Sequence, residues 1–204
     1  MSNSNSFNVP NTLTAIRLVL AIAVFVLMAL AQSSSQAAPR YYVAATVLFV
    51  LAASTDWIDG FWARRYEQVT VLGRIFDPFV DKVIICGVFI SLVAEPASQV
   101  KSWMAVVVVA RELLVTALRG FIEQRGTDFS ASMSGKLKMV VQCVAATASL
   151  WSLAAAPESS WHPGWLGDAT FWLIWAAVAI TIYSGLEYVI AAARLIGTAA
   201  PPED

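Results

Sequence analysis

Four aspartates lie close together in the sequence at spacings that suit a shared site. Asp56 and Asp59 are three positions apart, and Asp77 and Asp81 are four positions apart. On helices, both spacings place the two carboxylates of a pair on one face. The first pair ends one apolar segment and the second pair opens the next, so a short antiparallel turn would bring the pairs together. The sequence therefore predicts a cluster of four carboxylates.

Such a cluster needs compensating positive charge, and divalent cations are the best candidates. Oxygen ligands suit Mg²⁺ or Mn²⁺, and four carboxylates can hold two ions. Two adjacent ions can hold a phosphoryl group between the attacking and leaving oxygens. Gly60, Ala63 and Gly73 leave room for a nucleotide to approach the backbone. Arg64 adds a fork-shaped donor for phosphate, so the stretch predicts phosphoryl transfer at two metal ions.

The alternative is a structural cluster of ion pairs at the helix ends. Four acids in fixed register with three small residues favour the metal site over this alternative. Pro78 lacks a backbone donor, so it either opens the second of these helices or kinks it. The basic residues that could neutralise the acids without a metal are Arg64, Arg65, Arg74 and Lys82.

The rest of the chain predicts membrane helices around this site. Of 204 residues, 58% are hydrophobic and 13% are charged, against about 25% charged residues in soluble domains. We expect one all-α membrane domain, 1–204, with an N-terminal cytoplasmic segment at 1–12 and a disordered tail at 197–204. A spanning helix needs about 20 residues, and several apolar segments fall short, which predicts a polar cavity at one end. The six expected membrane segments are Leu13–Ala31, Tyr41–Thr55, Phe79–Ala94, Trp103–Leu118, Leu137–Ala156 and Ala169–Ile190.

The basic residues predict the orientation of these six segments. Lys and Arg concentrate on the cytoplasmic side of membrane proteins. Only Arg40 and Lys101 fall on one side, and we therefore expect that side to be the outer one, with both termini and the polar cavity facing the cytoplasm. On the other side lie Arg17, Arg64, Arg65, Arg74, Lys82, Arg111, Arg119, Arg125, Lys136, Lys138 and Arg194.

Three other features of the sequence, a possible signal peptide, two cysteines and one histidine, do not indicate a catalytic or processing role. Leu18–Ala31 has the length of a signal-peptide core, but the polar segment before it favours a retained first helix. Cys86 and Cys143 are isolated within apolar runs and are expected to be free thiols. His162 follows Trp161 in a loop on the outer side, where a solvated histidine is expected rather than a catalytic one.

The aspartate stretch resembles the signature of the CDP-alcohol phosphotransferase family. That signature reads Asp-x2-Asp-Gly-x2-Ala-Arg, seven or eight residues, then Gly-x3-Asp-x3-Asp, and every fixed position is matched here. The resemblance implies a six-helix membrane fold, usually a homodimer, with a site open to the cytoplasm. It also implies that a metal-bound CDP-lipid is attacked at the lipid-side phosphate, with release of CMP.

The resemblance assigns roles to the residues of the signature. Asp56, Asp59 and Asp77 would bind metal, and Asp81 would be a shared metal ligand and the general base on the acceptor hydroxyl. A base must lie within hydrogen-bond reach of the hydroxyl it deprotonates. The residues that would line the CDP moiety are Asp56, Asp59, Gly60, Ala63, Arg64, Gly73 and Asp77.

Other motifs resemble those of bacterial phosphatidylglycerophosphate synthases. This resemblance implies CDP-diacylglycerol as donor and glycerol 3-phosphate as acceptor. Met139 stands where the subtype is expected to have Thr, which is a departure from the pattern. The matching motifs are Pro10-Asn11-x-Leu13-Thr14-x-x-Arg17, Ala110-Arg111-Glu112 with Thr116 and Leu118-Arg119, Ser132-x-x-Gly135-Lys136-x-Lys138, and Ser184-Gly185-x-Glu187-Tyr188.

The dianionic phosphate of that acceptor needs its own cationic pocket, because the catalytic acids would repel it. Arg111 lies inside an apolar run, where a functional role is expected, although pairing with Glu112 or Glu187 is an alternative. For the two lysines, the alternative is anchoring at the cytoplasmic membrane face. The predicted acceptor-phosphate residues are Arg111, Arg119, Lys136, Lys138, Thr14 and Arg17.

Two other functions compete with this interpretation. A cardiolipin synthase of the same family would use phosphatidylglycerol as acceptor and would need less cationic charge. A divalent-cation transporter would spread its acids across the depth of the bilayer, whereas Asp56, Asp59, Asp77 and Asp81 are all expected at one end. No feature points to a nucleic acid partner.

Overall fold

The computed structural model confirms the all-α expectation for the residues it describes, which are 9–34, 36–66, 71–123, 133–155 and 164–198. Side chains are described for 14–34, 36–55, 79–122, 135, 137–155 and 164–194. A short 3-10 helix, η1 (Pro96–Ser98), precedes the fourth helix. The six α-helices are α1 (Val9–Ser33), α2 (Ala38–Tyr66), α3 (Val71–Leu92), α4 (Ser102–Glu123), α5 (Met133–Ala154) and α6 (Leu166–Thr198).

Several helices are longer than the apolar segments that predicted them. The helix α1 begins at Val9 and α6 ends at Thr198, so both helices reach into the terminal segments expected at 1–12 and 197–204, whose extent stays a prediction. Pro78 lies within α3, so it does not open that helix. Helices satisfy their own backbone hydrogen bonds and continue through polar residues, whereas hydropathy marks only the apolar part. The loop that contains His162 lies outside the described residues.

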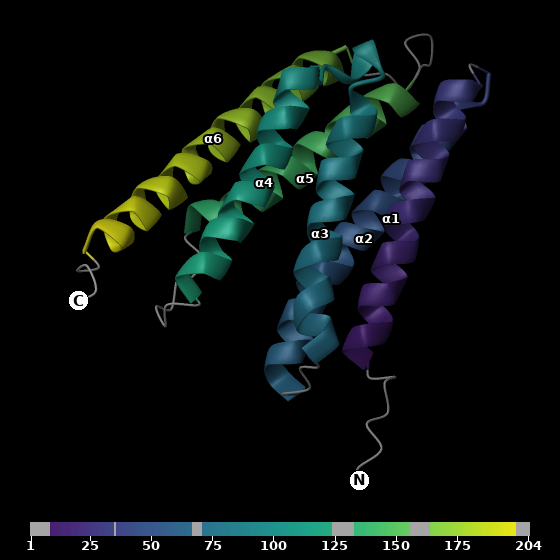
Figure 1. Ribbon diagram of the computed structural model, residues 1–204. Coiled ribbons are helices and arrows are strands. Elements are labelled where there is room, and N and C mark those ends of the chain that lie inside the picture. Colours follow the sequence, from purple (N-terminus) through teal and green to yellow (C-terminus); the bar gives the residue numbers. More distant parts are fainter. Residues whose placement is uncertain (1–8, 35, 67–70, 124–132, 156–163, 199–204) are drawn as a thin grey trace.

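The helices form two groups of three that are joined near the middle. Consecutive helices alternate in direction, and α1 begins towards the side of the molecule at which α6 ends (Figure 1). On one side, α1 packs against α2 and α3. On the other, α6 packs against α4 and α5, and contacts between α2 and α5 connect the two groups.

The surface is largely apolar, and polar side chains lie inside. Val19 and Leu113 are each 65% exposed and Trp172 is 70% exposed, whereas Arg17 is only 2% exposed. Many large exposed apolar side chains together with buried charged ones are uncommon in soluble proteins and fit a lipid-facing surface around a core that contains polar groups. Within the described residues, three stretches are long and apolar enough to cross a membrane, namely Thr14–Ser33, Leu137–Ala154 and Leu166–Arg194.

Buried side chains recur every three or four residues along each helix, and polar residues continue the apolar stripes. On α4, the stripe of Met104, Val108 and Val115 also contains Arg111. On α5, Lys138 and Gln142 precede the buried Ala145 at the same spacing. Because a helix has 3.6 residues per turn, such a stripe faces the neighbouring helices along its whole length. The packing that forms the core therefore also turns these polar groups inward.

Candidate functional site

The predicted carboxylate site lies on two consecutive helices. Asp56 and Asp59 belong to the last third of α2, and Asp77 and Asp81 belong to the first half of α3. The two helices run in opposite directions and are joined by residues 67–70 (Figure 1). The side chains of 56–78, which include Gly60, Ala63, Arg64 and Gly73, lie outside the described set. The clustering of the four carboxylates therefore stays a prediction.

Asp81 is the one carboxylate of the signature whose side chain is described, and it is bound by an arginine from α1. Arg17 Nη1 lies 2.6 Å from Asp81 Oδ1, and the two side chains are 2% and 24% exposed. Burial of a guanidinium is tolerated when it is paired and hydrogen-bonded. A charge-assisted bond of this length also fixes the orientation of the carboxylate.

The packing of α1 on α3 makes this pair possible. Gly87 on α3 has no side chain, and the ring of Phe25 occupies the place that a Cβ atom would need. Thr14 and Arg17 continue the buried stripe of Ala21 and Val24 towards the beginning of α1. Arg17 was predicted to bind the acceptor phosphate, but its observed partner is Asp81. The three- to four-residue spacing along α1 indicates that Arg17 is buried, but not that its partner is Asp81.

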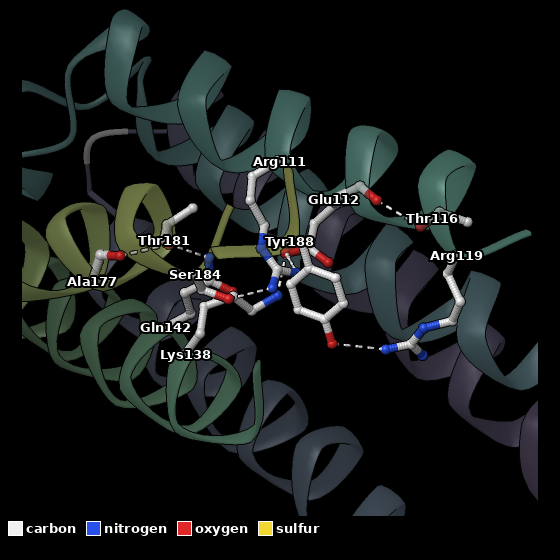
Figure 2. Close-up of polar contacts among 10 residues, drawn as sticks. All are labelled: Arg111, Glu112, Thr116, Arg119, Lys138, Gln142, Ala177, Thr181, Ser184 and Tyr188. Carbon is white, nitrogen blue, oxygen red and sulfur yellow. Dashed lines mark hydrogen bonds and ion pairs between the residues drawn. The ribbon is translucent and has the colours of Figure 1, made fainter. Parts of the chain in front are cut away.

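A second polar cluster lies between α4, α5 and α6 (Figure 2). Glu112 is 6% exposed and forms ion pairs with Lys138 across the α4–α5 contact and with Arg111 at 3.4 Å. Arg111 Nη2 donates to the hydroxyl of Ser184 on α6 at 2.5 Å. The pairing of Arg111 with Glu112 was the alternative interpretation of Arg111, and it is observed. One buried acid is thus shared by two buried cations.

Tyr188 on α6 joins Arg119 to this cluster (Figure 2). Arg119 Nη2 donates to the Tyr188 hydroxyl at 3.0 Å. The guanidinium carbons of Arg111 and Arg119 lie 5.5 and 5.9 Å from the centre of the Tyr188 ring, within cation–π distance. Sequence reasoning used Tyr188 only as a marker of the subtype and missed this role. The periodicity of α6, with Ser184 and Tyr188 one turn apart, was the available signal.

Two arginines in this cluster have an N–H donor that forms no hydrogen bond with the described residues. The Nε atoms of Arg111 and Arg119 are buried and have no hydrogen-bond partner among the described residues. Buried donors of this kind are uncommon, since most buried polar groups are hydrogen-bonded. In the contacts that the structure describes, Arg111 and Lys138 pair with one acid, Glu112, and Arg119 bonds to the neutral Tyr188, so these contacts leave a net positive charge. Such a cluster can bind an anion.

Of the six residues predicted to bind the acceptor phosphate, three belong to this cluster. The other three are not part of it in the contacts that the structure describes. Arg111, Arg119 and Lys138 share it, whereas Arg17 lies on Asp81. Thr14 is buried near the beginning of α1, and the side chain of Lys136 is outside the described set. Gln142 extends the cluster through its bond to Thr181, at 2.8 Å, and sequence reasoning missed both residues.

An apolar helical exterior around buried cations is typical of membrane proteins, and a carboxylate-rich motif beside such cations is the combination expected of membrane enzymes that act on phosphate esters. The chain matches the CDP-alcohol phosphatidyltransferase family over residues 7–183, and it belongs to that family.

Individual relatives cover nearly the whole chain. A protein of Bacillus subtilis named CDP-diacylglycerol–glycerol-3-phosphate 3-phosphatidyltransferase is 32% identical over 194 residues, which are 89% of this chain and 93% of the relative. A protein of Escherichia coli K12 with the same name is 34% identical over 196 residues, which are 91% and 95% of the two chains. A Shigella flexneri protein of that name is 33% identical over the same shares.

Proposed function

We propose that the chain transfers the phosphatidyl group of CDP-diacylglycerol to glycerol 3-phosphate, giving phosphatidylglycerol phosphate and CMP. The names of relatives that align over about nine tenths of the chain support this reaction. The structural observation that carries the choice of acceptor is the positive cluster at Arg111 and Arg119, whose buried Nε donors suit a phosphate. A lipid acceptor without a terminal phosphate would not supply the anionic oxygens that these donors could bind.

The four carboxylates of the signature are suitable ligands for divalent cations. Asp56, Asp59, Asp77 and Asp81 would hold two Mg²⁺ or Mn²⁺ ions, because carboxylate oxygens are the ligands that these ions prefer. When bound, the two ions would neutralise the pyrophosphate and activate the attacking hydroxyl. The partly exposed carboxylate of Asp81, held from one side by Arg17, is compatible with this role.

The chain's own residues would then carry out the transfer. Asp81 would accept the proton of the glycerol 3-phosphate hydroxyl while that oxygen forms a bond to the lipid-side phosphorus. The bond from this phosphorus to the bridging oxygen breaks, and CMP leaves with the bonding electrons. Arg17 would keep the Asp81 carboxylate oriented towards the hydroxyl. Arg64 would donate to the CDP phosphates, beside the small residues Gly60, Ala63 and Gly73.

We also propose that all six helices cross the bacterial inner membrane, with both termini and the polar cavity on the cytoplasmic side. The predicted excess of Lys and Arg on that side supports this orientation. The signature also lies where α2 ends and α3 begins, at the same end of the helices as the start of α1. A homodimer remains an expectation from the family resemblance.

The reaction can be tested with purified protein in mixed micelles of detergent and CDP-diacylglycerol. We expect CMP release with glycerol 3-phosphate, and little or none with phosphatidylglycerol, inositol phosphate or serine. The lipid product should be identified by mass. CMP release with phosphatidylglycerol alone would establish the cardiolipin synthase alternative. Metal uptake into vesicles without CMP release from any acceptor would favour the transporter.

The acceptor pocket can be tested by separate Arg111→Ala, Arg119→Ala and Lys136→Ala substitutions. Loss of one charge-assisted phosphate contact costs about 1.5–3 kcal/mol, which is about a tenfold to hundredfold rise in KM. We expect at least one substitution to raise the KM for glycerol 3-phosphate in this way. The KM for CDP-diacylglycerol should stay within about threefold, because that substrate lies at the carboxylates.

Arg40→Ala provides a matched control on the predicted outer side of the membrane and should change neither KM. If Arg111→Ala, Arg119→Ala and Lys136→Ala all leave both constants unchanged, the acceptor pocket lies elsewhere in the protein.

A further inference from the structure

One stretch of α6 surrounds the side chain of Arg111. The Ser184 hydroxyl accepts from Arg111 Nη2 at 2.5 Å. One residue further, Gly185 leaves the space that the arginine stem occupies, since a Cβ atom there would lie 3.2 Å from Arg111 Cγ. The ring of Tyr188 then lies one turn on, 5.5 Å from Arg111 Cζ. Ser184 and Tyr188 thus contact the guanidinium group of Arg111, and Gly185 lies against its stem. We refer to these three residues as the α6 cradle.

The α6 cradle also contacts a second arginine. Tyr188 accepts a hydrogen bond from Arg119 through its hydroxyl and lies close to both guanidinium groups through its ring (Figure 2). An ordinary helix hydroxyl behaves differently. Thr181, one turn earlier, donates to the carbonyl of Ala177 in its own helix at 2.6 Å, which is the usual local bond of a buried threonine. The hydroxyl groups of Ser184 and Tyr188 instead accept hydrogen bonds from arginines on α4.

We propose that Ser184, Gly185 and Tyr188 are positioning residues that orient Arg111 and Arg119 to receive an acceptor bearing a phosphate monoester. This proposal rests on the proposed function. None of the three carries a charge for the phosphate, so they act through the arginines. Arginine loses much side-chain entropy when it is fixed. Holding both guanidinium groups in place before the acceptor arrives removes that cost from binding, and this preorganisation favours a phosphorylated acceptor over a neutral alcohol.

Tyrosine substitutions separate the two contributions of Tyr188. Tyr188→Phe keeps the ring but removes the acceptor for Arg119, and we expect the KM for glycerol 3-phosphate to rise about threefold to tenfold. Tyr188→Leu removes the ring as well, and we expect a rise of about tenfold to a hundredfold. For both variants, the KM for CDP-diacylglycerol should stay within about threefold. Tyr183, which is 65% exposed on the same helix, provides the control: Tyr183→Phe should behave as wild type.

Glycine substitutions test the position of Arg111 without removing any charge or hydrogen bond. Gly185→Ala should force the stem of Arg111 to shift by a few tenths of an ångström, and we expect the KM for glycerol 3-phosphate to rise about threefold or more. Gly120→Ala is the matched control on α4, because a Cβ atom there meets nothing within 4 Å. The thermal unfolding midpoint of each variant in detergent shows whether the fold is intact.

The outcomes distinguish this proposal from the proposed function. The proposal is supported if the KM for glycerol 3-phosphate rises while the KM for CDP-diacylglycerol does not. The rise should be largest for Tyr188→Leu and smaller for Tyr188→Phe. Equal rises in both KM values, or wild-type constants in Tyr188→Phe, Tyr188→Leu and Gly185→Ala, overturn the cradle and leave the reaction in place. A wild-type protein that releases no CMP with glycerol 3-phosphate overturns both.

Discussion

Asp81→Asn is expected to lower turnover by a factor on the order of 10² or more, the usual contribution of a general base. The amide keeps the shape of the carboxylate but cannot take the proton of the attacking hydroxyl. Arg17 also loses its anionic partner at 2.6 Å. Turnover of CDP-diacylglycerol should be followed as CMP release at saturating glycerol 3-phosphate, so that a change in acceptor affinity does not hide the loss.

Asp56→Ala separates a metal ligand from the base. If Asp81 acts chiefly as the base, binding of CDP-diacylglycerol should survive better in Asp81→Asn than in Asp56→Ala. Binding can be measured without turnover by leaving out the acceptor. An equal loss of binding in the two variants would show that Asp81 is mainly a metal ligand. Arg17→Lys adds a further comparison, because it keeps the positive charge but loses the planar geometry of the guanidinium.

Removal of divalent cations is expected to abolish activity. Without Mg²⁺ or Mn²⁺, the four predicted carboxylates would repel the pyrophosphate of the donor rather than hold it. CMP release should fall to background in excess EDTA and return when either ion is added beyond the chelator. Ca²⁺ at the same concentration is a suitable comparison, since it prefers longer bonds and more ligands than Mg²⁺. Full turnover in excess EDTA would end the two-metal interpretation.

The sequence predicted the helices well because their signals are local. Each apolar segment corresponds to one helix, and the position of Arg111 inside an apolar run indicated that its role is not that of a solvent-exposed charge. The helix ends were predicted less well, because hydropathy does not detect a helix that continues through polar residues. Pro78 illustrates this point, since α3 begins at Val71, well before the apolar run.

The partners that charged residues have on other helices could not be predicted, because they depend on which helices pack together. Nothing in the local pattern of α1 indicates that Arg17 will meet Asp81 on α3. Similarly, Glu112 could have paired only with its neighbour Arg111, yet it also pairs with Lys138 from α5. The resemblance identified the chemistry of the aspartates, and the packing of α4 on α6 was needed to reveal the role of Tyr188.

The charges of α4 also bear on how the protein enters the membrane. Along its length, α4 carries Arg111, Glu112 and Arg119. An arginine near the centre of an isolated membrane-spanning helix, which is the place of Arg111 in α4, adds about 2.5–3.5 kcal/mol to the free energy of insertion. On its own, α4 is therefore expected to insert poorly into a membrane. Apart from the pair between Arg111 and Glu112 within α4, the described partners of these charges are Lys138 of α5 and Ser184 and Tyr188 of α6. If α4 crosses the membrane as proposed, it is therefore expected to insert stably only after α5 and α6 have been synthesised, so that its insertion coincides with assembly of the proposed acceptor pocket.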